Sequence, residues 1–179
     1  MHREDFTLCD YKLSLFRAEK ADSPLIVFHS FSDEGEAVYQ ELRKQNAPEC
    51  HFLSIGISDW QREMSPWPAA ALSKDGEDFS GGADAYLESL RSTILPWAEE
   101  RIYGKASFIG IDGYSLAGLF ALYAMYKTDV FSRVAGMSGS FWFPGFKEFC
   151  KENTMKILPE KLYLSVGDQE SKTRHPILK

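Results

Sequence analysis

Short apolar runs alternate along this chain with longer segments in which apolar residues recur at helical spacing. Continuous apolar runs such as Leu25–His29 (LIVFH) are typical of strands buried on both faces of a sheet. The pattern predicts strands over 25–29, 51–57, 107–111, 134–137 and 162–166, one or two edge strands over 6–17, and helices over 34–45, 83–103, 116–126 and 145–152. Pro96 is expected to kink the 83–103 helix or to begin a second helical segment.

Strands that alternate with helices predict an α/β domain with a mainly parallel sheet flanked by helices. The sequence contains no internal repeat, low-complexity tract or linker, so residues 1–179 are interpreted as a single domain. Parallel sheets bind ligands at the carboxyl ends of their strands. Three segments follow predicted strands at that edge: HSFSDEG (29–35), DGYSLAG (112–118) and GDQE (167–170).

The segment IDGYSLAGLF (111–120) places a serine between a predicted strand and a predicted apolar helix. A nucleophilic serine on such a sharp turn needs small residues two positions before and after it, and Gly113 and Ala117 meet that need. The turn also leaves the Leu116 N–H at a helix N-terminus, where it can stabilise an oxyanion. Ser115 is therefore the candidate nucleophile, and a capping serine in a plain turn is the alternative.

A catalytic triad on this fold runs along the chain in the order serine, acid, histidine. Asp168 and Glu170 both follow the last predicted strand, and either one could be the acid. The only later histidine is His175, too close to both acids to reach Ser115 from a separate loop. His2, His29 and His51 lie before the serine and are interpreted as structural. We expect the catalytic histidine to be missing from this chain.

The second oxyanion donor should come from the loop after the strand 25–29, where the backbone N–H groups of Phe31 and Ser32 are candidates.

The segment 58–82 is a long predicted loop that contains two tryptophans, and loops of this length are usually functional or disordered. Its aromatic residues argue against disorder. Substrate-binding candidates are Trp60 and Trp67 from this loop, together with Tyr114 and Trp142. Core packing is the alternative role for the tryptophans.

The net charge of −6 and the lack of a long basic run argue against a nucleic-acid partner. The N-terminal sequence MHREDFTLCD has no apolar core, and no apolar run reaches the roughly 18–20 residues of a membrane span, so we expect a cytoplasmic protein without a signal peptide or membrane partner. The three cysteines have no metal-ligand spacing and favour reduced thiols. We expect neither a metal nor a dinucleotide cofactor, because no ligand cluster or Gly-rich fingerprint is present.

The stretch GYSLAGLFALYAMYKTDVFSRVAGMSGSFWFPGF (113–146) combines the serine turn, an apolar helix, and Ser138-Gly139-Ser140 followed by Trp142. Together with DWQREMSPWPA (59–69) and FSGGADAYLESLRSTILPWAEE (79–100), it resembles the putative-esterase branch of the α/β-hydrolase fold. That branch includes enterochelin-esterase-like, feruloyl-esterase and S-formylglutathione-hydrolase families. The resemblance runs over roughly residues 20–179.

The resemblance implies an α/β-hydrolase-like three-layer sandwich with Ser115 as nucleophile, the Leu116 N–H as oxyanion donor, and the acid in SVGDQE (165–170). It also implies a histidine loop and a last helix that would lie beyond Lys179, so the domain is expected to lack its C-terminal part. The predicted function is that of a serine hydrolase acting on small carboxylic esters through an acyl-enzyme. A non-catalytic ligand-binding domain and an acyltransferase are the alternatives, and without its histidine the chain would retain little activity. Association into a homo-oligomer is one way to cover the edge and apolar face that a shortened sheet exposes.

Overall fold

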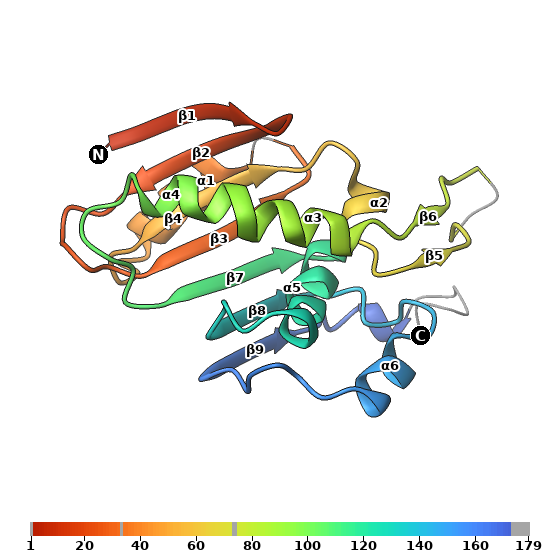
Figure 1. The fold of residues 1–179 in the computed structure, drawn as a ribbon. Coiled ribbons are helices and arrows are strands. Elements are labelled where there is room, and N and C mark those ends of the chain that lie inside the picture. The colour runs from red at the N-terminus through yellow and green to blue at the C-terminus, as the bar shows by residue number, and fades with distance from the viewer. Residues whose placement is uncertain (1, 33, 73–74, 173–179) are drawn as a thin grey trace.

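The computed structural model describes residues 2–32, 34–72 and 75–172, which contain a seven-stranded sheet (Figure 1). Its strand order is β1-β2-β4-β3-β7-β8-β9. The strands are β1 (His2–Leu8), β2 (Tyr11–Arg17), β3 (Leu25–Ser30), β4 (His51–Gly56), β7 (Ile109–Tyr114), β8 (Arg133–Met137) and β9 (Lys161–Ser165). The strands β4, β3, β7, β8 and β9 are parallel, whereas β1 and β2 add an antiparallel hairpin at one edge. The expected mainly parallel sheet is therefore confirmed.

Successive apolar side chains along β3 point to opposite faces of the sheet, and helices cover both faces. Leu25 and Val27 point into the larger core, beneath α3 (Ala83–Ser89), α4 (Leu95–Glu99) and α5 (Leu116–Lys127). Phe28 points to the opposite face, where it joins a smaller aromatic cluster beneath α1 (Gly35–Lys44). The last helix, α6 (Phe146–Glu152), is followed by β9 and a 3₁₀ turn at Glu170–Lys172. The three-layer α/β architecture follows from this arrangement.

Two predicted elements differ from the structure. The helix expected over 83–103 is α3, a π-helical segment at Leu90–Ile94, and α4, which ends at Glu99. The wider π turn lies directly before Pro96, which has no N–H for the ordinary helical ladder. The strand expected over 107–111 instead occupies Ile109–Tyr114, because β7 pairs with β3 from Leu25 onward and runs directly into Ser115.

The segment 58–82 has structure of its own among its described residues. It contains the short helix α2 (Trp60–Glu63) and a small hairpin made of β5 (Pro68–Ala69) and β6 (Phe79–Ser80). In the part of the chain that the structure describes, none of the helices has the length and hydrophobicity needed to cross a bilayer.

The strand β9 forms one edge of the sheet and is unusually apolar for an exposed strand. Leu162 and Leu164 are each 45% exposed, and Val166, just past the strand, is 74% exposed. An exposed apolar edge is the feature from which homo-oligomerisation was expected. Association itself stays a prediction.

Candidate active site

Ser115 occupies a strained turn between β7 and α5. Its backbone has φ 59° and ψ −120°, a conformation that residues with a side chain rarely adopt. Two backbone hydrogen bonds hold it to the neighbouring strand and loop: the Ser115 N–H donates to the Met137 carbonyl at 3.1 Å, and the Ser140 N–H donates to the Ser115 carbonyl at 3.0 Å. The surrounding sheet thus fixes the serine at the carboxyl end of the central strand.

Glycine is required near this turn because the chain passes very close to itself. A Cβ added to Gly113 would lie 2.5 Å from both the carbonyl carbon and the Cβ of Ala117. A Cβ on Gly118 would lie 3.0 Å from the Gly113 carbonyl oxygen and 3.1 Å from the Gly139 Cα. The small residues around Ser115 therefore have the steric role that the sequence predicted.

The Ser115 hydroxyl is partly exposed and lies 3.3 Å from the hydroxyl of Ser140, which is only 2% exposed. Ser140 belongs to the loop that follows β8, the strand next to β7. Its contact with Ser115 was not predicted, although the Ser-Gly-Ser sequence directly after a neighbouring strand was the available signal.

The expected oxyanion donors lie on two adjacent strand ends. Leu116 is the first residue of α5, so its N–H has no partner within the helix. In the β3–β7 register His29 pairs with Gly113. Phe31 and Ser115 each lie two residues beyond this pair, so they occupy matching positions after the two adjacent strands. The Ser32 N–H already donates to the Glu34 carboxylate at 3.3 Å. Of the two candidates in this loop, the Phe31 N–H is thus the one without such a competing acceptor.

The two candidate acids lie after β9 and are exposed. Glu170 accepts the Gly167 N–H at 2.7 Å, and Asp168 accepts a hydrogen bond from the Gln169 amide at 2.9 Å. A hydrogen bond from the Ser138 N–H to the Ser165 carbonyl joins this loop to the one after β8. Neither acid contacts Ser115 in the described structure, and His175 lies outside the described residues.

The histidines that precede the serine have structural partners. The buried His29 ring donates from Nδ1 to the Asp112 carbonyl at 3.3 Å, and its burial lowers the pKa to about 4. His51 is buried and accepts the Ala18 N–H at 3.0 Å through Nδ1. For His2 the structure describes only its backbone, in β1. No imidazole within the described residues hydrogen-bonds to Ser115.

The aromatic residues proposed for a substrate pocket occupy different settings. Trp67 packs on Tyr123 and three phenylalanines, and its indole N–H donates to the Pro144 carbonyl at 2.8 Å. Trp60 contacts Phe31 edge to face, with 5.5 Å between ring centroids, whereas Trp142 packs beside Phe79.

Tyr114 is 61% exposed and directly precedes the serine. Trp60 and Tyr114 thus lie next to the expected oxyanion loop and nucleophile, while Trp67 fastens the long loop to the core. Substrate binding by these residues stays a prediction. The described residues contain no group of three side chains that could hold a metal ion.

Comparison with known proteins places these features in a family context. A family model described as putative esterase matches residues 27–175. The protein YbbA of Bacillus subtilis (strain 168) is 27% identical over 150 residues, or 82% of this chain and 60% of YbbA. The siderophore enterobactin esterase of Emericella nidulans is 29% identical over 102 residues, or 55% of this chain and 31% of that esterase.

Among solved structures, the siderophore hydrolase EstB from Aspergillus nidulans superposes with a TM-score of 0.70 at 20% identity. The match covers 97% of this chain and 71% of EstB, and it shows the shared fold. The chain spans less than two thirds of the length of the two curated relatives.

Proposed function

Because this chain belongs to the putative esterase family, we propose that it is a serine ester hydrolase that forms an acyl-enzyme on Ser115. The observation that carries the proposal is the backbone of Ser115, held at φ 59° between β7 and α5 with its hydroxyl partly exposed. A plain turn at this position would favour glycine, which adopts positive φ without strain. The geometry instead presents a hydroxyl at the edge of the sheet where ligands bind.

In the proposed reaction, the Ser115 Oγ attacks the ester carbonyl, and its proton passes to a general base. The N–H groups of Leu116 and Phe31 stabilise the negative charge on the former carbonyl oxygen. The alcohol then leaves with a proton, and water releases the acid from the serine. We place the triad histidine outside residues 2–172, because His29 and His51 have other partners. Asp168 or Glu170 would orient it.

The substrate class proposed is a small carboxylic ester, with siderophore esters as the first to test. One similar sequence is named a siderophore enterobactin esterase, and one similar structure is named a siderophore hydrolase. The exposed Tyr114 and the Phe31–Trp60 pair would offer aromatic contact area beside the nucleophile.

The test is covalent labelling with a fluorophosphonate probe, with and without added imidazole as a substitute base. We expect labelling of the wild-type chain that imidazole accelerates and that Ser115→Ala abolishes. Ser89→Ala is the matched control, because its hydroxyl lies on the exposed side of α3 and contacts only the Ala85 carbonyl. Hydrolysis of short p-nitrophenyl esters under the same conditions would distinguish hydrolysis from acyl transfer to another acceptor.

A second function, binding without catalysis, is favoured by one observation: none of the described imidazoles contacts Ser115. A non-catalytic domain would leave the fluorophosphonate unreacted at every imidazole concentration. That outcome would exclude the esterase proposal for this polypeptide.

A further inference from the structure

The sheet face beneath α1 is aromatic at one end of its strands and polar at the other. At one end, Phe16 of β2 and Phe52 of β4 pack with Phe28 and Tyr39 in an aromatic cluster. Toward the carboxyl ends of β3 and β4, the same face carries hydroxyl groups and a lysine instead. The helix α1 begins against Ser54, where Gly35 leaves no room for a Cβ, and none of the helix residues is among those that line the cavity described next.

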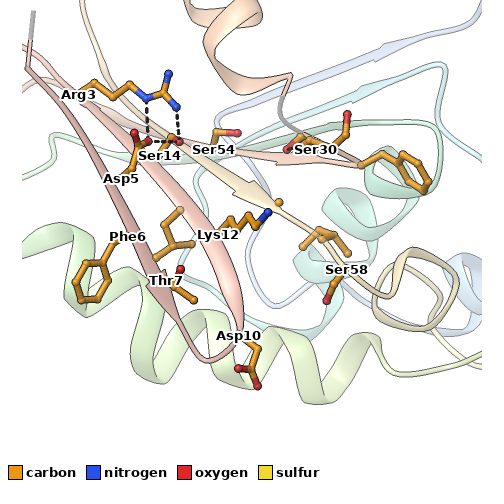
Figure 2. Close-up of a pocket in the computed structure, with 15 residues that line it drawn as sticks. Arg3, Asp5, Phe6, Thr7, Asp10, Lys12, Ser14, Ser30, Ser54 and Ser58 are labelled. Carbon is orange, nitrogen blue, oxygen red and sulfur yellow. Dashed lines mark hydrogen bonds and ion pairs between the residues drawn. The ribbon is translucent and has the colours of Figure 1, made fainter.

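A cavity of about 780 Å³ lies over this polar region, with walls from β1, β2 and the ends of β3 and β4 (Figure 2). Cavities of roughly 300–1,000 Å³ are typical of small-molecule sites. Gly56 lies in the lining, where a Cβ would make ordinary contacts with Lys12 at 3.6 Å and with the Ser32 carbonyl oxygen at 3.8 Å. Ser115 is not among the lining residues, but Phe31 and Ser32 of the candidate oxyanion loop are, so the cavity adjoins the proposed nucleophile site. Its polar lining includes Thr7, Lys12, Ser54 and Ser58, together with the charged residues Arg3, Asp5 and Asp10.

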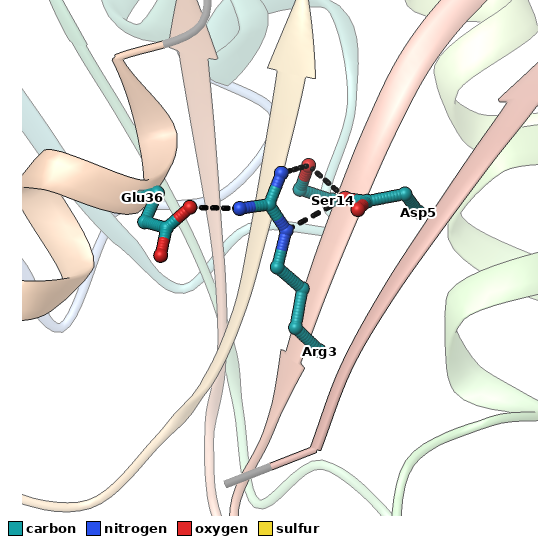
Figure 3. Close-up of polar contacts among 4 residues, drawn as sticks. All are labelled: Arg3, Asp5, Ser14 and Glu36. Carbon is teal, nitrogen blue, oxygen red and sulfur yellow. Dashed lines mark hydrogen bonds and ion pairs between the residues drawn. The ribbon is translucent and has the colours of Figure 1, made fainter.

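One end of the cavity is closed by a network around Arg3 (Figure 3). The Arg3 guanidinium donates to Asp5 at 2.8 Å and to the Ser14 hydroxyl at 3.5 Å, and it also pairs with Glu36 of α1. The Ser14 hydroxyl donates to Asp5 at 2.7 Å, and these two hydrogen bonds to Asp5 lower the pKa of its carboxyl group. Arg3 is therefore held between two carboxylates, Asp5 and Glu36, within the wall, and its charge is not left for a ligand.

Lys12 is the cation that remains available in this cavity. No described carboxylate lies within ion-pair distance of its ammonium group. Asp10 also lines the cavity, but Figure 2 shows its carboxylate pointing away from Lys12 at the β1–β2 turn. An unpaired ammonium at a concave surface attracts anions, since the protein walls reduce the screening by water.

A buried hydroxyl group supports a ligand at the same place. Ser54 is only 5% exposed and lines the cavity, yet its hydroxyl has no hydrogen-bond partner among the described residues. The Ser54 oxygen is not among the fully enclosed polar atoms without a partner, so it is accessible from the cavity to a bound molecule. The hydroxyls of Thr7 and Ser58 are likewise without a described partner. Three free hydroxyl groups therefore accompany the free ammonium.

We propose that this cavity binds a small anion that carries hydroxyl groups, such as a sugar acid or a sugar phosphate. The Lys12 ammonium pairs with the carboxylate or phosphate, and Ser54, Thr7 and Ser58 hydrogen-bond to the anion and its hydroxyl groups. This site does not depend on ester hydrolysis at Ser115.

The test is a protein-observed NMR titration at low ionic strength with gluconate, glucose 6-phosphate and uncharged glucose. We expect the two anions, but not glucose, to shift the amide resonances of Gly56 and Ser58 at millimolar concentration. The stronger of the two anions identifies the preferred group, carboxylate or phosphate. Binding should weaken as salt is added.

Lys12→Gln should weaken binding by about tenfold or more, because it removes a charge-assisted contact. Ser54→Ala should weaken it severalfold. Lys151→Gln is the matched control, an exposed lysine on α6, and should leave binding unchanged. The proposal is overturned if neither anion shifts the cavity resonances, or if Lys12→Gln and Lys151→Gln have equal effects. Unchanged resonances elsewhere in the Lys12→Gln spectrum would show that the variant is folded.

Discussion

Two desolvated ionisable groups near Ser115, the buried His29 and the half-buried Asp112, should give opposite pH dependences of stability. Burial lowers the pKa of His29 from its ordinary 6.5 to about 4, and its Nε2 is enclosed without a partner. Burial raises the pKa of Asp112 from 3.8 to about 7, because its Oδ1 is enclosed without a cation or donor. Asp112 lies on β7 between Phe28 of β3 and Ala135 of β8, which offer it no hydrogen-bonding side chain.

The signs follow from which state binds more protons. Between pH 4 and 6.5 the unfolded chain protonates His29 while the folded protein does not, so this group makes stability fall as the pH falls. Between pH 3.8 and 7 the folded protein holds a proton on Asp112 that the unfolded chain releases, so this group makes stability fall as the pH rises. At about 1.4 kcal/mol per pH unit, the limits are about 3 kcal/mol for His29 and about 4 kcal/mol for Asp112. The two contributions largely cancel in the wild type.

Single substitutions should uncover each contribution. We expect Asp112→Asn to gain stability relative to the wild type as the pH rises from 4 to 7, and His29→Gln to gain it as the pH falls from 6.5 to 4. The measurement is the free energy of unfolding by urea at several pH values, taken as the difference from the wild type so that all other groups cancel. The test is how this difference in unfolding free energy changes with pH, because its absolute size also includes the effect of the substitution on packing. If the difference for Asp112→Asn is constant from pH 4 to 7, the raised pKa of Asp112 is wrong.

Three further predictions concern the serine turn. Gly113→Ala should lower the free energy of urea unfolding by about 3 kcal/mol or more because of its clash with Ala117. Gly56→Ala, whose Cβ would make only ordinary contacts from 3.6 Å outward, should change it by about 0.5 kcal/mol or less, and equal costs would refute the steric argument. Ser115→Gly should stabilise the fold by about 1–2 kcal/mol while abolishing fluorophosphonate labelling, and a destabilised variant would show that the turn is not strained. Ser140→Ala should slow labelling of Ser115 about fivefold with Ser140→Thr restoring the rate, since one hydrogen bond of about 1 kcal/mol is lost, and an unchanged rate would remove Ser140 from the site.

The fold could be predicted from the sequence because its signals are local. Apolar runs such as Leu25–His29 and the small residues around Ser115 are visible within short windows. The second helical segment at Pro96 was predicted and is α4, but the π turn at Leu90–Ile94 was not, because it changes the backbone without changing which residues are apolar. The shift of β7 to Ile109–Tyr114 also depends on pairing with a distant strand.

The polar cavity could not be predicted for a related reason. Thr7, Lys12 and Ser54 come from three strands, and only the strand register brings them to one face. In sequence each is an ordinary polar residue within a predicted strand segment. The contact between Ser115 and Ser140 likewise joins two loops that are separated by 25 residues.

The strain at Ser115 favours a chemical role for its side chain over a structural one. Glycine would adopt this backbone without strain, and the same segment uses glycine at positions 113 and 118 where sterics demand it. A serine with positive φ costs about 1–3 kcal/mol, whereas its one side-chain contact, to Ser140, returns about 1 kcal/mol at most. Packing therefore does not account for a hydroxyl at this point. A nucleophile does, because its reactivity requires the exposure and fixed direction that this turn imposes.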